Sequence, residues 1–153
     1  MAKPEDTLTL ETTQGPVVIE MRPDLAPGHV ARIKELVKDG FYDGIVFHRV
    51  IDGFMAQTGC PEGTGTGGSG KKLNAEFNDT KHGRGTVSMA RSANPDSGDS
   101  QFFICFDDAA WLDGQYTAWG KVIDGMDNVD KIKRGEPVRD PDQIVKARMA
   151  GDA

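Results

Sequence analysis

The sequence predicts a mainly β fold, a closed or nearly closed antiparallel barrel with helices packed over its ends. Three observations lead to this prediction. Most apolar segments are short and alternate with polar residues, which is typical of strands. Turn residues separate these segments, so hairpins and loops join successive strands. Only two segments carry extended helical periodicity, and several strands lie between them, which argues against a regular alternation of strands and helices.

The first part of the chain predicts a hairpin followed by a helix. Residues 6–13 alternate in polarity, residues 16–22 are rich in β-branched side chains, and residues 14–16, Gln-Gly-Pro, supply the turn. The helix begins at Pro27, which suits a first turn, and ends at Gly40. Its apolar face consists of Val30, Ile33, Leu36 and Val37.

A second hairpin is predicted over residues 47–58. Residues 47–51 alternate with a period of two, Asp52-Gly53 is a strong turn dipeptide, and a short strand follows over residues 54–58. In a regular strand this alternation places His48 on the face opposite to Arg49.

The remainder contains a glycine-rich loop and further strands. Residues 59–70 hold six glycines and predict an irregular loop. Strands are expected over residues 86–90, 101–106, 117–123 and 143–150. Residues 107–113 predict one helical turn with an Asp cap, and a second full helix is expected from Met126 to Arg134, ended by Gly135.

Bulk properties restrict the class of protein. The 153 residues fit one domain, residues 1–153, and the formal net charge of −6 does not provide the basic face that nucleic-acid binding requires. No apolar run is long enough for a membrane span, and no secretory signal is visible, so we expect a cytoplasmic protein. We also expect it to be a monomer. The two cysteines make no disulfide framework; Cys105 is expected in the core and Cys60 in an exposed loop.

The second hairpin combines residues that suit peptide recognition. It places a fixed cation, Arg49, near the aromatic Phe54 and the amide Gln57. Arginine stays charged at any working pH and presents a rigid set of donors. Beside an apolar wall it suits binding a carbonyl or an amide rather than transferring protons.

A second group of candidates lies in residues 101–116. Gln101 and Phe103 share one face of a predicted strand, so an amide and an aromatic ring lie side by side. Trp111, Leu112 and Tyr116 follow within a short stretch. These apolar residues either belong to the core or line a small apolar cup beside Arg49.

The glycine-rich loop offers an alternative function. Gly65 to Gly70 satisfy the pattern G-x-G-x-x-G, and the segment from Gly65 resembles a P-loop, except that Lys72 stands where Ser or Thr binds magnesium. Such motifs require a following helix, and the next residues lack helical periodicity. We therefore favour a loop whose backbone approaches a ligand closely. The three histidines show no metal-ligand spacing, so neither a metal nor a cofactor is expected.

Several segments together resemble one family. Residues 47–59, FHRVIDGFMAQTG, look like the signature hairpin of the cyclophilins, the peptidyl-prolyl cis-trans isomerases. Residues 63–68 (GTGTGG), 88–90 (SMA), 100–104 (SQFFI) and 111–114 (WLDG) match in the family's order. The resemblance covers about residues 6 to 150 and implies an eight-stranded antiparallel β-barrel closed by two helices. It also implies an isomerase of X-Pro bonds in proteins that assists folding without a cofactor.

The resemblance implies roles for particular residues. Arg49 would be the catalytic arginine, supported by Phe54 and Gln57. Met55, Phe103 and Leu112 would complete the proline pocket with Phe54. The substrate chain would contact Gln57, Gln101 and the backbone of Ala90, while Gly65 would border a neighbouring groove and Trp111 the rim.

The chain also departs from the eukaryotic pattern of the family. Tyr116 stands where many members have a pocket histidine, and Arg91 stands where many have asparagine. These features resemble single-domain bacterial members. The expected partners are proline-containing peptides and flexible protein segments, with cyclosporin implied by Trp111. A non-catalytic peptide-binding or chaperone module on the same fold, and a nucleotide-binding protein built on the glycine loop, remain as alternatives.

Overall fold

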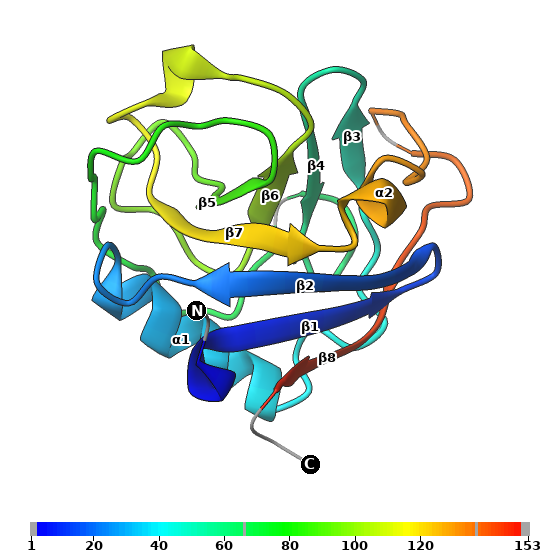
Figure 1. The fold of residues 1–153 in the computed structure, drawn as a ribbon, viewed down its shortest axis with the longest axis horizontal. Coiled ribbons are helices and arrows are strands. Elements are labelled where there is room, and N and C mark those ends of the chain that lie inside the picture. The colour runs from blue at the N-terminus through cyan, green and yellow to red at the C-terminus, as the bar shows by residue number, and fades with distance from the viewer. Residues whose placement is uncertain (1–2, 66, 137, 151–153) are drawn as a thin grey trace.

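A computed structural model describes residues 3–65, 67–136 and 138–150 of the chain. Eight strands form one antiparallel sheet that curls around a single large core, with helix α1, Pro27–Lys38, against β8 (Figure 1). The strands are β1 Thr7–Thr12, β2 Gly15–Met21, β3 Arg49–Ile51, β4 Met55–Thr58, β5 Thr86–Met89, β6 Phe102–Cys105, β7 Ala118–Asp124 and β8 Ile144–Met149. A 3₁₀ turn, Pro4–Asp6, precedes β1. No helix within the described ranges has the length and apolar character needed to cross a membrane.

The prediction of a closed barrel is wrong. The strand order is β3-β4-β6-β5-β7-β2-β1-β8, so β3 and β8 are the two edges of an open, curled half-barrel. Between these edges the described chain makes isolated bridges, Val46 with Gln143 and Val50 with Gly135, rather than a ladder. The reason is that the chain before β3 follows a run of turns, and β3 itself is only three residues long.

The core arises from the alternation read in the sequence. In β1 and β2 every second side chain is buried, including Leu8, Leu10, Ile19 and Met21. Phe102 packs edge-to-face on Trp119, with ring centroids 5.4 Å apart. This arrangement supports the inner face of β6, while its other face is free to build a site.

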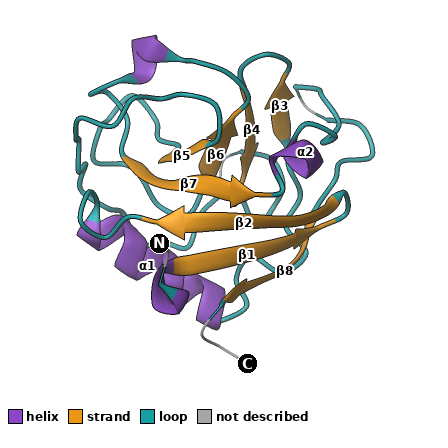
Figure 2. Cartoon of the chain, in the orientation of Figure 1, coloured by secondary structure: helices purple, strands orange, loops and turns teal. Residues whose placement is uncertain are grey.

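The helical elements predicted over residues 107–113 and 126–134 are both shorter in the structure than expected (Figure 2). Helix α2 covers only Met126–Val129, followed by turns, because Arg134 donates to the carbonyl oxygens of Asp130 and Ile132 and the Lys133 N–H donates to Asp142. These groups are therefore no longer available for helical hydrogen bonds. The turn predicted over residues 107–113 is a 3₁₀ turn at Ala110–Leu112, without a side-chain cap.

The cysteine predictions have different outcomes. Cys105 is buried in β6, as predicted. Cys60 is also buried, so the expectation of an exposed thiol is wrong. The glycine-rich loop folds over its sulfur, and the N–H groups of Gly65 and Gly67 donate to Sγ at 3.3 and 3.2 Å. Burial alone would raise the pKa of Cys60, but the backbone donors outweigh it and lower the value to about 7.

Candidate active site

The hairpin β3–β4 places Arg49 and Gln57 directly opposite each other. Their Cα atoms are register partners, so their side chains share one face of the sheet. Nη1 of Arg49 donates to Oε1 of Gln57 at 3.3 Å. Since Gln57 is also paired with Phe103 on β6, the cation lies beside an aromatic ring of the next strand.

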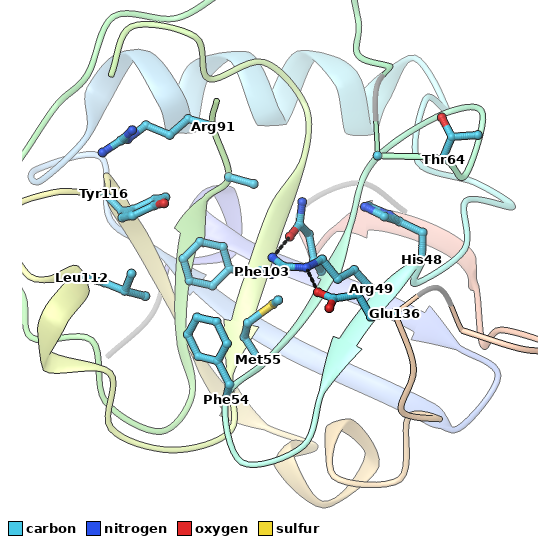
Figure 3. A pocket seen from close by; sticks show the side chains of 13 residues that line it. His48, Arg49, Phe54, Met55, Thr64, Arg91, Phe103, Leu112, Tyr116 and Glu136 are labelled. Atoms are coloured by element: carbon cyan, nitrogen blue, oxygen red, sulfur yellow. Dashed lines mark hydrogen bonds and ion pairs between the residues drawn. The ribbon is translucent and has the colours of Figure 1, made fainter. Parts of the chain in front are cut away.

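These side chains open into a cavity of about 460 Å³ (Figure 3). Its volume lies within the range of small-ligand pockets. The lining residues are His48, Arg49, Phe54, Met55, Gln57, Thr64, Gly65, Ala90, Arg91, Phe103, Leu112, Tyr116 and Glu136. Ten of the twelve site residues expected from the sequence therefore meet in one pocket; Gln101 and Trp111 do not line it.

The floor of the pocket is a small apolar cluster separate from the main core. Met55, Phe103 and Leu112 are buried in it, and Phe54 and Tyr116 pack against them. The ring of Phe103 meets that of Tyr116 edge-to-face, with centroids 5.8 Å apart. The cluster is thus a cup lined mainly by apolar side chains, as one of the two sequence interpretations proposed.

The two predicted residues outside the pocket lie at its borders. Gln101 lines an adjoining groove of about 230 Å³ and donates through Nε2 to the carbonyl oxygens of Gly65 and Gly67, both at 2.9 Å. Trp111 is 65% exposed, and its ring centroid lies 5.5 Å from that of Phe54. Gln101 therefore holds the glycine-rich loop, and Trp111 extends the apolar wall outward.

Arg91 and Tyr116 form one side of the rim. The guanidinium carbon of Arg91 lies 4.4 Å from the centre of the Tyr116 ring. Nε and Nη2 of Arg91 also donate to the carbonyl oxygen of Gln115. The cation is thus held flat on the aromatic ring, at the positions where the sequence departs from the family's eukaryotic pattern.

Three residues that line the pocket, His48, Thr64 and Glu136, were not among the site residues expected from the sequence. His48 lines the same cavity as Arg49, so the expectation that it faces away is wrong; β3 begins at Arg49, and His48 precedes the regular strand. Burial, and then the charge of Arg49, lower the pKa of His48 below its ordinary value. Glu136 pairs with Nε of Arg49. It lies far along the chain in a segment without periodicity, so no local signal indicated it.

A chain of polar groups, in which His82 and Ser88 are buried, lies against the ring of Phe103. Nδ1 of His82 lies 3.0 Å from Asp113, and its Nε2 lies 2.9 Å from the hydroxyl of Ser88. The His82 ring stacks on Phe103, with centroids 6.4 Å apart. Although Asp, His and Ser occur in this order, Ser88 is fully buried, so the group fixes the pocket wall rather than offering a nucleophile.

The glycine-rich loop lacks the context of a nucleotide site. Residues 71–85, which follow it, form no helix, so the phosphate site that a helix N-terminus would provide has no counterpart here. Within the described parts of the chain, no cluster of three or more His, Cys, Asp or Glu residues is placed to hold a metal ion. The loop instead forms a wall shared by the pocket and the adjoining groove.

Comparisons with known proteins identify the family of this chain. The family model of cyclophilin type peptidyl-prolyl cis-trans isomerases matches residues 7–149. A probable peptidyl-prolyl cis-trans isomerase of Brucella suis is 53% identical, covering 99% of this chain and 86% of that protein. Peptidyl-prolyl cis-trans isomerase B of Bacillus subtilis is 44% identical, covering 81% and 87%.

Solved structures show the same relationship. The crystal structure of a cyclophilin from Hirschia baltica superposes with a TM-score of 0.92 at 32% identity, covering 99% of this chain and 76% of that one. A cyclophilin type peptidyl-prolyl cis-trans isomerase from Cryptosporidium parvum, crystallised in the presence of the dipeptide Ala-Pro, gives 0.87 at 28% identity, covering 94% and 98%. The match of the family model over nearly the whole chain, together with these relatives and structures, shows that the chain belongs to the cyclophilins and is a peptidyl-prolyl cis-trans isomerase.

Proposed function

We propose that the protein accelerates rotation about X-Pro bonds by a non-covalent mechanism in which Arg49 stabilises the twisted amide and the apolar cup holds the proline ring. The observation that carries this proposal is the position of Arg49 at the edge of a cavity lined by Phe54, Met55, Phe103 and Leu112. The cavity thus combines an apolar surface for a ring with a permanent hydrogen-bond donor.

The chemistry requires a lower barrier, not a shifted equilibrium. Rotation about a peptide bond faces a barrier of about 18–20 kcal/mol, which arises from amide resonance. The two X-Pro isomers differ by only about 0.5–1 kcal/mol. A donor aimed at the prolyl nitrogen favours its pyramidal form, in which resonance is lost, so it stabilises the twisted state more than either planar isomer.

The magnitude of this effect is limited. A hydrogen bond to a charged group contributes about 1.5–3 kcal/mol, which corresponds to roughly 10–100-fold in rate. The Arg49 side chain is 42% exposed, so the lower end applies. Further acceleration comes from the cup, because it fixes the proline ring while the preceding residue rotates in a water-poor site.

Backbone and amide groups orient the substrate chain in this proposal. The N–H of Ala90 donates to the carbonyl oxygen of Gln101 at 3.0 Å. The carbonyl oxygen of Ala90 accepts no hydrogen bond among the described residues, so it would accept from a substrate N–H. Gln57 and Gln101 line the adjoining groove, where the extended chain next to proline would lie. The Ala-Pro dipeptide present with the Cryptosporidium relative supports proline-containing peptides as substrates.

We extend the proposal to the substrates of the enzyme, its location in the cell and its binding of cyclosporin. Its substrates are flexible or unfolded segments of proteins, whose X-Pro bonds exchange slowly without a catalyst. The protein works as a monomer in the cytoplasm, assists folding and binds cyclosporin at the same pocket. The competing function is peptide binding or chaperone activity without isomerisation; the charged group at the cup favours catalysis, because a pure apolar binder gains little from it.

The test is a proline isomerisation assay on an Ala-Pro-containing peptide with the variants Arg49→Ala and Arg22→Ala. Arg22 forms an exposed ion pair with Asp24 outside the pocket and serves as the matched loss of one arginine. We expect kcat/KM to fall at least about tenfold for Arg49→Ala and to remain near wild type for Arg22→Ala. Peptide binding by the wild type without measurable isomerisation would support the competing function.

A further inference from the structure

Glu136 lies at the mouth of the pocket and contacts the proposed catalytic arginine. Its carboxylate accepts a hydrogen bond from Nε of Arg49 at 2.5 Å. Figure 3 shows the carboxylate beside the guanidinium, on the side away from Arg91 and Tyr116. The residue therefore touches the cation without facing the apolar cup.

The backbone holds Glu136 in this place. Gly135, the preceding residue, exchanges both backbone hydrogen bonds with Val50, each at 2.8 Å. Val138, two residues after Glu136, donates to the carbonyl oxygen of His48 at 3.3 Å. These backbone hydrogen bonds flank Glu136 and connect its segment to Val50 and His48, the two neighbours of Arg49 in the chain. The backbone therefore fixes the position of Glu136 relative to Arg49.

Two of the three guanidinium nitrogens of Arg49 donate hydrogen bonds to neighbouring side chains. Nε is held by Glu136, and Nη1 is held by Gln57 at 3.3 Å. Within the described residues Nη2 makes no hydrogen bond, so one donor nitrogen is left for a substrate. Gln57 in turn is fixed by Gln101. The orientation of the Arg49 guanidinium thus depends on two side chains, the amide of Gln57 and the carboxylate of Glu136.

We propose that Glu136 is a positioning residue, which orients the guanidinium of Arg49 so that its free Nη2 edge faces the proline held in the cup. The inference rests on the proposed role of Arg49. The two side chains are 42% and 57% exposed, so the ion pair contributes little to stability. The ion pair matters because it restricts the orientation of Arg49. Without Glu136, a half-exposed arginine side chain would sample several rotamers, and only some of them point the guanidinium at the substrate.

This proposal predicts a particular pattern in kinetics. Glu136→Ala should lower kcat by about two- to fivefold, the range of an exposed ion pair, while KM stays nearly constant because the apolar cup is unchanged. Glu136→Gln keeps an acceptor oxygen and should restore part of the lost kcat. If the carboxylate instead weakened Arg49 by neutralising its charge, both variants would be faster than wild type, which would overturn the proposal.

The matched control is Asp52→Asn. Asp52 lies in the turn of the same hairpin and pairs with Arg134 at 3.1 Å, outside the pocket. Removing this exposed carboxylate changes the net charge of the chain by the same amount as Glu136→Gln. We expect kcat and KM of this variant to match wild type; a loss equal to that of Glu136→Gln would show a general charge effect and contradict positioning.

A spectroscopic measurement separates this inference from the proposed function. The Nε–H resonance of Arg49, assigned by its disappearance in Arg49→Lys, should lie downfield and exchange slowly with water in wild type. It should move upfield and exchange faster in Glu136→Ala. If Arg49→Ala is inactive but Glu136→Ala leaves both kcat and the resonance unchanged, the positioning role fails and the proposed mechanism stands. If Arg49→Ala keeps full activity, the mechanism itself fails.

Discussion

Gln57 donates a hydrogen bond through Nε2 to Oε1 of Gln101 at 2.9 Å, although the two residues lie 44 positions apart in the chain. The oxygen of the same Gln57 amide accepts from Arg49, and Gln101 donates to the carbonyl oxygens of Gly65 and Gly67. A continuous row of hydrogen bonds therefore joins the arginine to the glycine-rich loop. The orientation of the Arg49 side chain is therefore linked to the conformation of the glycine-rich loop.

The close approach of β4 to the start of β6 requires a glycine at position 59. Gly59 has a φ of +97°, and a Cβ added there would lie 2.4 Å from the carbonyl oxygen of Ser100. Gly53 has a similar φ of +73° but nothing within 4 Å of an added Cβ. We expect Gly53→Ala to lower the free energy of unfolding by about 1–2 kcal/mol and Gly59→Ala by about 2–5 kcal/mol, since a steric clash is added. Equal losses in urea titrations would contradict the packing at Gly59.

Acid should destabilise the fold from just below neutrality. Burial is the main cause that lowers the pKa of both His48 and His82 below the ordinary 6.5. The unfolded chain then binds more protons than the folded one in the interval beneath pH 6.5, so the free energy of unfolding falls as the pH drops through it. Glu76 and Asp142, whose pKa values are also lowered despite burial, add to the loss at lower pH. Urea titrations at pH 7, 6 and 5 check this. His48→Gln should reduce the slope, and a free energy that stays constant down to pH 5 would disprove it.

The catalysed rate should be nearly flat between about pH 6 and pH 9. Arginine does not titrate in this range, and an amide does not titrate at all. His48 is the described pocket residue whose ordinary pKa lies near neutrality, and burial and the charge of Arg49 lower that pKa, so at most a shallow step is expected at the acidic end of this range. The measurement is kcat/KM against pH at fixed ionic strength with a protease-free readout. A bell-shaped profile would indicate general acid–base catalysis, and its loss in His48→Gln would transfer the catalytic role to the histidine.

Cyclosporin should inhibit the enzyme and change its tryptophan emission. Trp111 is exposed beside Phe54, so a bound apolar cyclic peptide would remove its indole from water. The other tryptophan, Trp119, is fully buried in the core and should not respond. Titration of wild type and Trp111→Phe assigns the signal to one ring. Full activity and unchanged emission of wild type at high drug concentration would rule out this binding.

The sequence predicted those site residues for which the local sequence pattern and the family resemblance agreed. The alternation of residues 47–51 and the turn Asp52-Gly53 place Arg49 and Gln57 on one face, and the structure confirms this pairing. Glu136 could not be predicted, because its contact with Arg49 depends on the tertiary bridge between Val50 and Gly135. His48 was misplaced because the strand begins at Arg49, two residues later than the pattern over residues 47–51 suggested.

The errors in the fold have similar causes. The stripe of Met126, Val129 and Ile132 does face inward, but side-chain hydrogen bonds from Arg134 replace the helix after its first turn. Whether the barrel closes depends on pairing between the segments around residues 44–50 and 135–144. These segments meet through scattered backbone bonds, which no periodicity in either segment could reveal.

The central claim is that Arg49 lowers the rotational barrier while the cup supplies the binding. The most direct test measures both quantities on one peptide: Kd by titration, and cis–trans exchange of the enzyme-bound peptide by NMR, for wild type and Arg49→Ala. We predict that exchange on the enzyme slows at least about tenfold while Kd changes only slightly, because the apolar cup remains intact. Unchanged exchange on the enzyme, with all of the loss appearing in Kd, would show that Arg49 only binds the substrate and would contradict the account.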